Sequence, residues 1–277
     1  MVVDGEINSL FSFQSGTIYT CTPGEYGRLG SVAMVKRVSE HLESSGLKPY
    51  KIPVGGSNGL GSFGYLLGVD ELVSQWQDMH NNDKSTIDHI VFACGSGGTA
   101  AGIVLGIALI YGALDSATTG HMPVVHAVGV CDSPDYFYEF VAKIADEMGI
   151  LLPAELGMTT EEFVRKYMIV HHGKGLGYAV STDEELDFIS EFGVETGIAI
   201  DPVYSGKALY NFFNYVMEEE QAASFQGKNV LFWHTGGSLG LFEQEDKLLS
   251  RLKVQSPVKR LDIYGRGADG SIDISHE

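Results

Sequence analysis

The chain has little positive charge, little cysteine and no long apolar run, and each shortage excludes a class of protein. Its 277 residues include 18 Lys and Arg against 36 Asp and Glu, which gives a formal net charge of −18. A nucleic-acid backbone requires basic residues, so we exclude nucleic acid as a partner. The same surplus of carboxylates disfavours an anionic membrane surface. No apolar run approaches the ~20 residues that cross a bilayer, so we predict no membrane partner.

The three cysteines, Cys21, Cys94 and Cys131, stand at unrelated spacings. This pattern is not typical of a disulfide framework, so we expect free thiols in a reducing compartment. The first residues include acidic but no basic side chains, which is atypical of a signal or transit peptide. We therefore expect a cytoplasmic protein, or a mitochondrial or plastid protein if an upstream segment precedes the sequence.

Apolar segments alternate with amphipathic ones along most of the chain. Near-continuous apolar runs predict strands that are buried on both faces, at 50–54, 89–95, 123–130, 167–171 and 229–234. The segments between them have the 3.6-residue period of helices. This alternation predicts an α/β fold with a doubly wound, mostly parallel sheet. In such sheets ligands bind at the carboxyl ends of the strands.

Three turns between predicted strands and helices are rich in glycine, at 54–61, 94–102 and 234–240. Glycine allows backbone N–H groups to approach a ligand without a Cβ in the way. The first turn of the following helix adds unpaired donors and a partial positive charge. Such turns can hold a phosphate group, although each one taken singly could serve only as a tight turn.

Two other motifs compete for these glycines. The segment 95–100 matches G-x-G-x-x-A, so a nicotinamide dinucleotide is possible, with Asp132 contacting the ribose. The turns that contain Ser57 and Ser238 also match the G-x-S-x-G pattern of a serine nucleophile. Too little chain follows Ser238 to supply a histidine partner outside the tail. For Ser57 no spacing selects its partners.

The histidines do not indicate a metal site. His171 and His172 are adjacent, so on a strand they point to opposite faces and cannot share a metal ion. His126 lies inside a predicted strand and is interpreted as a core histidine whose hydrogen bonds are satisfied. We therefore predict no metal.

Read together, six ordered motifs resemble the D-cysteine desulfhydrase and 1-aminocyclopropane-1-carboxylate deaminase family, and the eukaryotic desulfhydrases most closely. These motifs lie at 48–65, 91–102, 129–138, 173–186, 201–212 and 231–242. The resemblance implies pyridoxal 5'-phosphate as cofactor and the tryptophan synthase β-like fold, known as fold type II. It also implies a D-amino acid substrate, with conversion of D-cysteine to pyruvate, hydrogen sulfide and ammonia, and a homodimer.

The same resemblance implies roles for individual residues. Tyr178 and Tyr204 correspond to active-site tyrosines that can transfer protons. Ser205 stands where the deaminases carry Glu, which favours the desulfhydrase, and Thr235 is a second candidate for contact with the pyridine nitrogen. The residues implied to bind the cofactor are Gly95, Ser96, Gly97, Gly98, Thr99, Ser205, Thr235 and Gly236.

One family feature is missing from the sequence. The lysine that forms the Schiff base with the cofactor stands in a GNK-type motif, and no such motif occurs here. Lys51 and Lys207 do not match its position. We therefore expect this chain to be inactive or nearly so, and the alternative is a non-catalytic protein that binds the cofactor or another phosphate ligand.

The motifs also suggest a domain organisation. A divergent segment is expected at 1–25, the cofactor-binding α/β domain at 26–252 and a disordered tail at 253–277. The smaller domain of the family is expected to be incomplete.

Overall fold

The sheet is fully parallel, as the sequence predicts. The computed structural model describes residues 17–80, 86–111, 122–150, 157–216 and 223–255. Within them four strands pair in the order β3-β2-β1-β4. Their bounds are β1 (His89–Cys94), β2 (Val124–Gly129), β3 (Met168–His172) and β4 (Val230–Phe232). Every pairing is parallel, and all six residues of β1 are buried.

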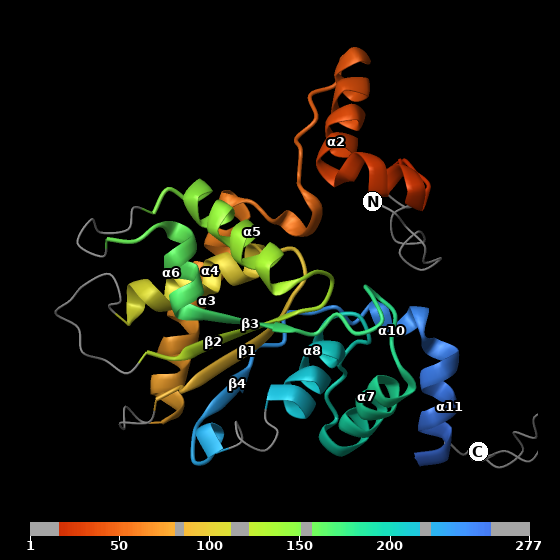
Figure 1. Ribbon diagram of the computed structural model, residues 1–277. Helices are drawn as coiled ribbons and strands as arrows, with labels where there is room; N and C mark the ends of the chain where they lie inside the picture. The colour runs from red at the N-terminus through yellow and green to blue at the C-terminus, as the bar shows by residue number, and fades with distance from the viewer. Residues whose placement is uncertain (1–16, 81–85, 112–121, 151–156, 217–222, 256–277) are drawn as a thin grey trace, which may run out of the picture.

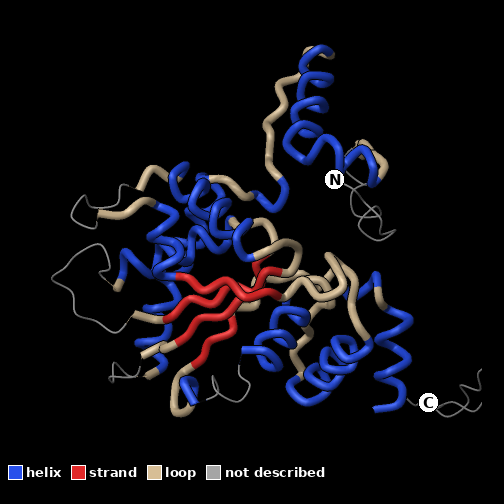
Figure 2. The backbone as a smooth tube through the Cα atoms, viewed as in Figure 1, coloured by secondary structure: helices blue, strands red, loops and turns tan. Residues whose placement is uncertain are grey.

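Helices cover both faces of this sheet (Figure 1). On one face lie α3 (Gly59–Met79), α4 (Gly98–Ile110), α5 (Pro134–Glu147) and α6 (Thr160–Tyr167). On the other lies α8 (Ser205–Asn211) with its π-helical continuation η3 (Phe212–Val216). Outside α8 packs α7 (Asp183–Thr196), and α11 (Glu245–Gln255), which follows α10 (Gly240–Glu243), packs against α7. This arrangement confirms the doubly wound α/β class. Figure 2 shows that the loops at the carboxyl ends of the strands gather at one edge of the sheet.

The N-terminal part stands away from the sheet. Helix α2 (Pro23–Ser44) projects from the body of the molecule and is followed by a connecting segment and the short η1 (Val54–Gly56) (Figure 1). The strand predicted at 50–54 is wrong. A strand needs a neighbour for its N–H and C=O groups, and this segment pairs with no described strand.

Helices α3 and α4 pack closely because α4 presents glycines to α3. A Cβ on Gly102 would lie 2.3 Å from the carbonyl oxygen of Ser62, and one on Gly106 would lie 3.0 Å from Val69. Only glycine permits this approach. Because α3 lies so close, the turn before it is brought onto the first turn of α4.

The described residues also bear on the predictions about membrane spans, cysteines and domain boundaries. No helix within the described residues is long and apolar enough to cross a membrane. All three cysteines are free, as predicted. The expected boundary at residue 25 falls within α2, and most of the tail expected at 253–277 lies outside the described residues.

Candidate active site

The turn after β1 forms an open cradle of backbone amides. Gly97 has φ +82° and is the N-cap of α4, a conformation that favours glycine. A Cβ on Gly95 would lie 2.9 Å from the ring of Tyr204, and one on Gly97 would lie 3.1 Å from Phe140. The amides of Thr99 and Ala100 donate to no described residue. The cradle therefore has free donors at the positive end of a helix, which fits a phosphate group.

The turn before α3 closes one side of the cradle. The hydroxyl of Ser57 donates to Ser96 Oγ at 2.6 Å and accepts from the amide of Gly98 at 3.2 Å. A Cβ on Gly55 would lie 2.1 Å from Ser96 Oγ, so glycine is required there as well. Two of the three glycine-rich turns thus meet at one point. The described partners of Ser57 are Ser96 and Gly98, neither of which is a base, so the arrangement does not support a serine nucleophile.

Two tyrosines meet beside the cradle. The hydroxyl oxygens of Tyr178 and Tyr204 are 2.5 Å apart, and their rings lie edge to face. Burial raises the pKa of Tyr204, and its hydrogen bond with Tyr178 raises this pKa further. Tyr204 therefore keeps its proton at neutral pH, while Tyr178 is 52% exposed and opens to solvent. The pair can carry a proton between the cradle and water.

A buried carboxylate holds Tyr204 in place. Asp201 is fully buried, and its Oδ2 accepts from the amides of Val203 at 2.9 Å and Tyr204 at 2.8 Å. Its Oδ1 accepts from the amide of Ser205 at 2.7 Å and from the Ser205 hydroxyl at 2.6 Å. The same hydroxyl accepts from the amide of Asp201 at 2.9 Å. Ser205 is thus engaged inside the protein.

The third glycine-rich turn packs on the same carboxylate. A Cβ on Gly237 would lie 2.7 Å from Asp201 Oδ1. In this turn the amide of Gly236 donates to His234 Nδ1 at 3.1 Å, and the half-buried Thr235 lies three residues after the end of β4. Because β1 and β4 are parallel neighbours, this turn reaches the same edge of the sheet as the cradle.

Neither lysine considered in the sequence lies free at the cradle. Lys51 is exposed in the segment before η1. The Nζ of Lys207 is fully buried and donates to the carbonyl oxygens of Val180 at 2.7 Å, Lys174 at 3.0 Å and Gly177 at 3.3 Å. It also lies 3.5 Å from a carboxylate oxygen of Glu185. We call these four oxygen-bearing groups the oxygen cage.

The histidines form a buried row that the sequence did not reveal. Nδ1 of His89 lies 3.0 Å from Nε2 of His126, and Nδ1 of His126 lies 2.8 Å from Nε2 of His171. The prediction that His126 is a satisfied core histidine is confirmed. His172 is exposed on the other face of β3, and the described residues contain no cluster that could hold a metal ion.

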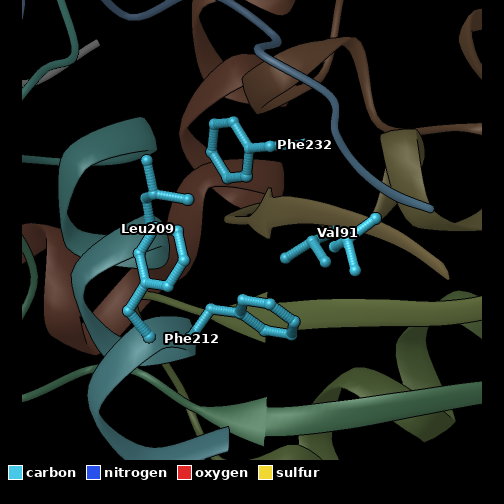
Figure 3. A pocket seen from close by; sticks show the side chains of 6 residues that line it. Val91, Leu209, Phe212 and Phe232 are labelled. Carbon is cyan, nitrogen blue, oxygen red and sulfur yellow. The ribbon is translucent and has the colours of Figure 1, made fainter. Parts of the chain in front are cut away.

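An apolar cavity of about 140 Å³ lies elsewhere, between the sheet and α8 (Figure 3). Its lining residues are Val91, Leu209, Phe212, Phe213, Val230 and Phe232. None of these side chains is polar, and Val91 and Val230 lie before the carboxyl ends of their strands. The cavity therefore cannot hold a phosphate and is separate from the candidate site.

Asp201, the Ser57–Ser96 contact and the oxygen cage are the parts of the site that sequence reasoning missed. Asp201 had a signal: an acidic residue that precedes a proline and a helix start within an apolar stretch is a candidate cap. The other two join residues 39 and about 30 positions apart, and no local pattern predicts them.

Comparison with known proteins identifies the arrangement. Residues 16–236 match the family model described as "Pyridoxal-phosphate dependent enzyme". The chain is 40% identical over 255 residues to the "Bifunctional D-cysteine desulfhydrase/1-aminocyclopropane-1-carboxylate deaminase, mitochondrial" of Arabidopsis thaliana, covering 90% of this chain. It is 35% identical to a "Putative 1-aminocyclopropane-1-carboxylate deaminase" of Thermotoga maritima, covering 84% of this chain and 65% of that protein.

A solved structure agrees with these sequence matches. The crystal structure of an "ACC deaminase homologue" superposes with a TM-score of 0.61 at 27% identity, covering 86% of this chain and 63% of the other. The chain spans 58% of the length of the Arabidopsis protein. The fold type II assignment made from the sequence is confirmed.

Proposed function

Because the chain belongs to the pyridoxal-phosphate dependent enzyme family, we propose that it is the cofactor-binding part of a D-cysteine desulfhydrase. The reaction converts D-cysteine and water to pyruvate, hydrogen sulfide and ammonia. 1-Aminocyclopropane-1-carboxylate is the second substrate candidate, since the Arabidopsis relative is named for both activities. The family description also disfavours the nicotinamide alternative, and the Asp132 carboxylate is engaged with the amide of Ser133 at 2.7 Å.

One observation carries this proposal: the phosphate-type cradle and the tyrosine pair are in contact. The ring of Tyr204 lies against Gly95, at a distance that leaves no room for a Cβ. The tyrosine pair therefore borders the cradle, and its hydroxyls would lie beside a ligand bound there. When bound, pyridoxal phosphate supplies an electron-withdrawing ring that stabilises negative charge on the amino acid.

The residues of the chain have separate tasks in this scheme. The amides of the cradle, with the hydroxyl of Thr99, hold the phosphate. Tyr204 holds a proton at its Oη, and Tyr178 exchanges that proton with water. Since Ser205 is bonded to Asp201, we assign the contact with the pyridine nitrogen to Thr235, with Gly236 beside it. A neutral hydroxyl there suits elimination from D-cysteine better than it suits the deaminase reaction.

The 277-residue chain is proposed to bind the cofactor without turning over substrate. Catalysis in the family requires a lysine that carries the cofactor, and Lys207, the buried lysine among the described residues, already donates to three carbonyl oxygens. A general base alone contributes about 10²–10⁴ in rate, so its loss is severe. Pairing as a homodimer and a cytoplasmic location stay predictions.

Titration of the purified chain with pyridoxal phosphate tests the proposal. We expect saturable binding, measured by equilibrium dialysis, and no cofactor attached to the protein by mass spectrometry after borohydride reduction. Gly95→Ala should weaken binding because its Cβ displaces Tyr204, whereas Gly193→Ala, whose Cβ meets nothing closer than 3.8 Å, should not. Absence of saturable binding would refute the function. Sulfide release from D-cysteine above that of free cofactor would refute the inactivity.

A further inference from the structure

The loop that carries Tyr178 is wound around a single buried cation. The carbonyl oxygens of Lys174, Gly177 and Val180 recur every three residues and all point at the Nζ of Lys207. Such convergence requires unusual backbone angles, which the loop supplies between these carbonyls. Gly175 has φ +56°, Gly177 has φ +148° and Ala179 has φ +60°.

Ala179 shows most clearly that the loop backbone is held in an unfavourable conformation. It is the one non-glycine residue with a left-handed φ among the described residues. Such a conformation costs an alanine about 1–2 kcal/mol, so the surrounding contacts must favour it. The carbonyl that follows, that of Val180, makes the shortest bond to the Lys207 ammonium, at 2.7 Å. The loop therefore adopts a strained path that delivers its oxygens to the cation.

The cage is tied to both tyrosines. Lys207 stands in the first turn of α8, and Tyr204 is the N-cap of that helix. Tyr178 lies between the cage residues Gly177 and Val180 and bonds the Tyr204 hydroxyl. Glu185 closes the cage and also accepts from the amide of Thr182 at 2.9 Å. One end of α8 thus supplies one tyrosine directly and holds the other through its lysine.

We propose that Lys207 is a positioning residue whose ammonium acts as a built-in monovalent cation, winding the loop 173–182 so that Tyr178 meets Tyr204. Carbonyl oxygens and a carboxylate around one point are the ligands that replace the hydration shell of potassium in proteins. Loss of the ammonium removes one hydrogen bond from each of three carbonyl oxygens and the ion-pair partner of the buried Glu185, so we expect the loop to open. The effect of this loss on catalysis rests on the proposed role of the tyrosines. Its effect on the structure of the loop does not depend on the proposed function.

Cleavage by trypsin reports directly on this loop. The bond after Lys174 is a trypsin site whose carbonyl is held by Lys207, so cutting requires the cage to open. We expect Lys207→Ala to be cut after Lys174 about tenfold faster than wild type or more. Lys143→Ala, which removes an exposed lysine from α5, is the matched control and should leave this rate unchanged.

Small cations should restore the resistance of Lys207→Ala to trypsin. Lys207→Ala leaves space for an ion, so ammonium or potassium chloride should return its cleavage rate toward that of wild type. Lys207→Met fills the space with an apolar stem and should not respond, and tetramethylammonium chloride at equal ionic strength should restore neither. If Lys207→Ala does not fold by circular dichroism, Glu185→Gln keeps the lysine while removing the charge of its partner, and it should be cut at an intermediate rate.

Fluorine NMR of 3-fluorotyrosine at position 178 separates positioning from general stability. The resonance should shift in Lys207→Ala toward its value in Tyr204→Phe and return on addition of ammonium. An unchanged cleavage rate, or faster cleavage and a shifted resonance that no cation reverses, would overturn the inference. Because neither readout involves pyridoxal phosphate, failure of the proposed function would appear only in the binding titration.

Discussion

Acid should destabilise this protein through its buried histidine row well before its carboxyl groups protonate. Burial, together with the smaller effects of the neighbouring His171 and His89, lowers the pKa of His126 to about 3. Burial also lowers the pKa of His171 to about 4. His126 is 4% exposed and packs against Phe212 and Phe225, so a charge there has no access to water.

The direction of the pH effect follows from how many protons the folded and unfolded states bind. The folded protein keeps His126 neutral, whereas an unfolded chain titrates this residue near its usual pKa of about 6.5. Between these two values the unfolded state binds more protons, so the free energy of unfolding falls as pH falls. At about pH 5 the loss from His126 alone is about 2 kcal/mol relative to neutral pH. His171 adds to this loss, but the two sites are coupled and do not contribute independently.

Urea denaturation at about pH 7.5 and about pH 5 measures this loss. His126→Gln keeps a hydrogen-bonding side chain but cannot be protonated, so its free energy of unfolding should change with pH by about 2 kcal/mol less than that of wild type. His172→Gln alters an exposed histidine of the neighbouring strand β3, next to His171 but on the opposite face, and serves as the control. The comparison is made within each variant, so a general loss of stability in His126→Gln does not affect it. An equal pH dependence in wild type and His126→Gln would refute the reasoning.

Two further substitutions test the cradle and its support. Gly97→Ala places a Cβ at φ +82° and 3.1 Å from a ring carbon of Phe140, so we expect its free energy of unfolding, measured by thermal denaturation, to fall by about 2 kcal/mol. Gly64→Ala, in an open position of α3, is the control and should be neutral or stabilising. Equal losses in the two variants would contradict the strain argument. Asp201→Asn removes a buried carboxylate that accepts four hydrogen bonds, so we expect a loss of about 3 kcal/mol in urea. Asp187→Asn removes only an exposed ion pair with Arg251 and should lower the free energy of unfolding by less than about 1 kcal/mol. A similar loss in Asp201→Asn and Asp187→Asn would show that the hydrogen bonds of Asp201 do not stabilise the fold as argued.

The parts of this protein that depend on local pattern were predictable from its sequence. The segment 89–102 is a continuous apolar run followed by glycines and small residues, and it forms the buried strand, the turn and the helix that such a run favours. The strand predicted at 50–54 failed because a short apolar run becomes a strand only beside a neighbour. Periodicity along the chain carries no information about that neighbour.

The support of the candidate site was not predictable in the same way. Lys207 and His126 are polar residues inside apolar segments, and each has its partners in other elements. Lys207 bonds a loop about 30 residues earlier in the chain, and His126 bonds residues 37 and 45 positions away. Burial of a polar group is favourable only when those partners are in place. A single sequence shows the group but not its partners.

Helix α4 has a consequence for how tightly an anion is held. Nearly the whole helix is enclosed by protein, with every residue from Ala100 to Ala108 buried. Its first turn is therefore fixed by the core of the domain before any ligand arrives. Association does not have to order the amides, so almost no conformational entropy is lost at this end of the ligand. The phosphate-binding site would therefore be preformed, which suits a chain that holds the coenzyme through its phosphate.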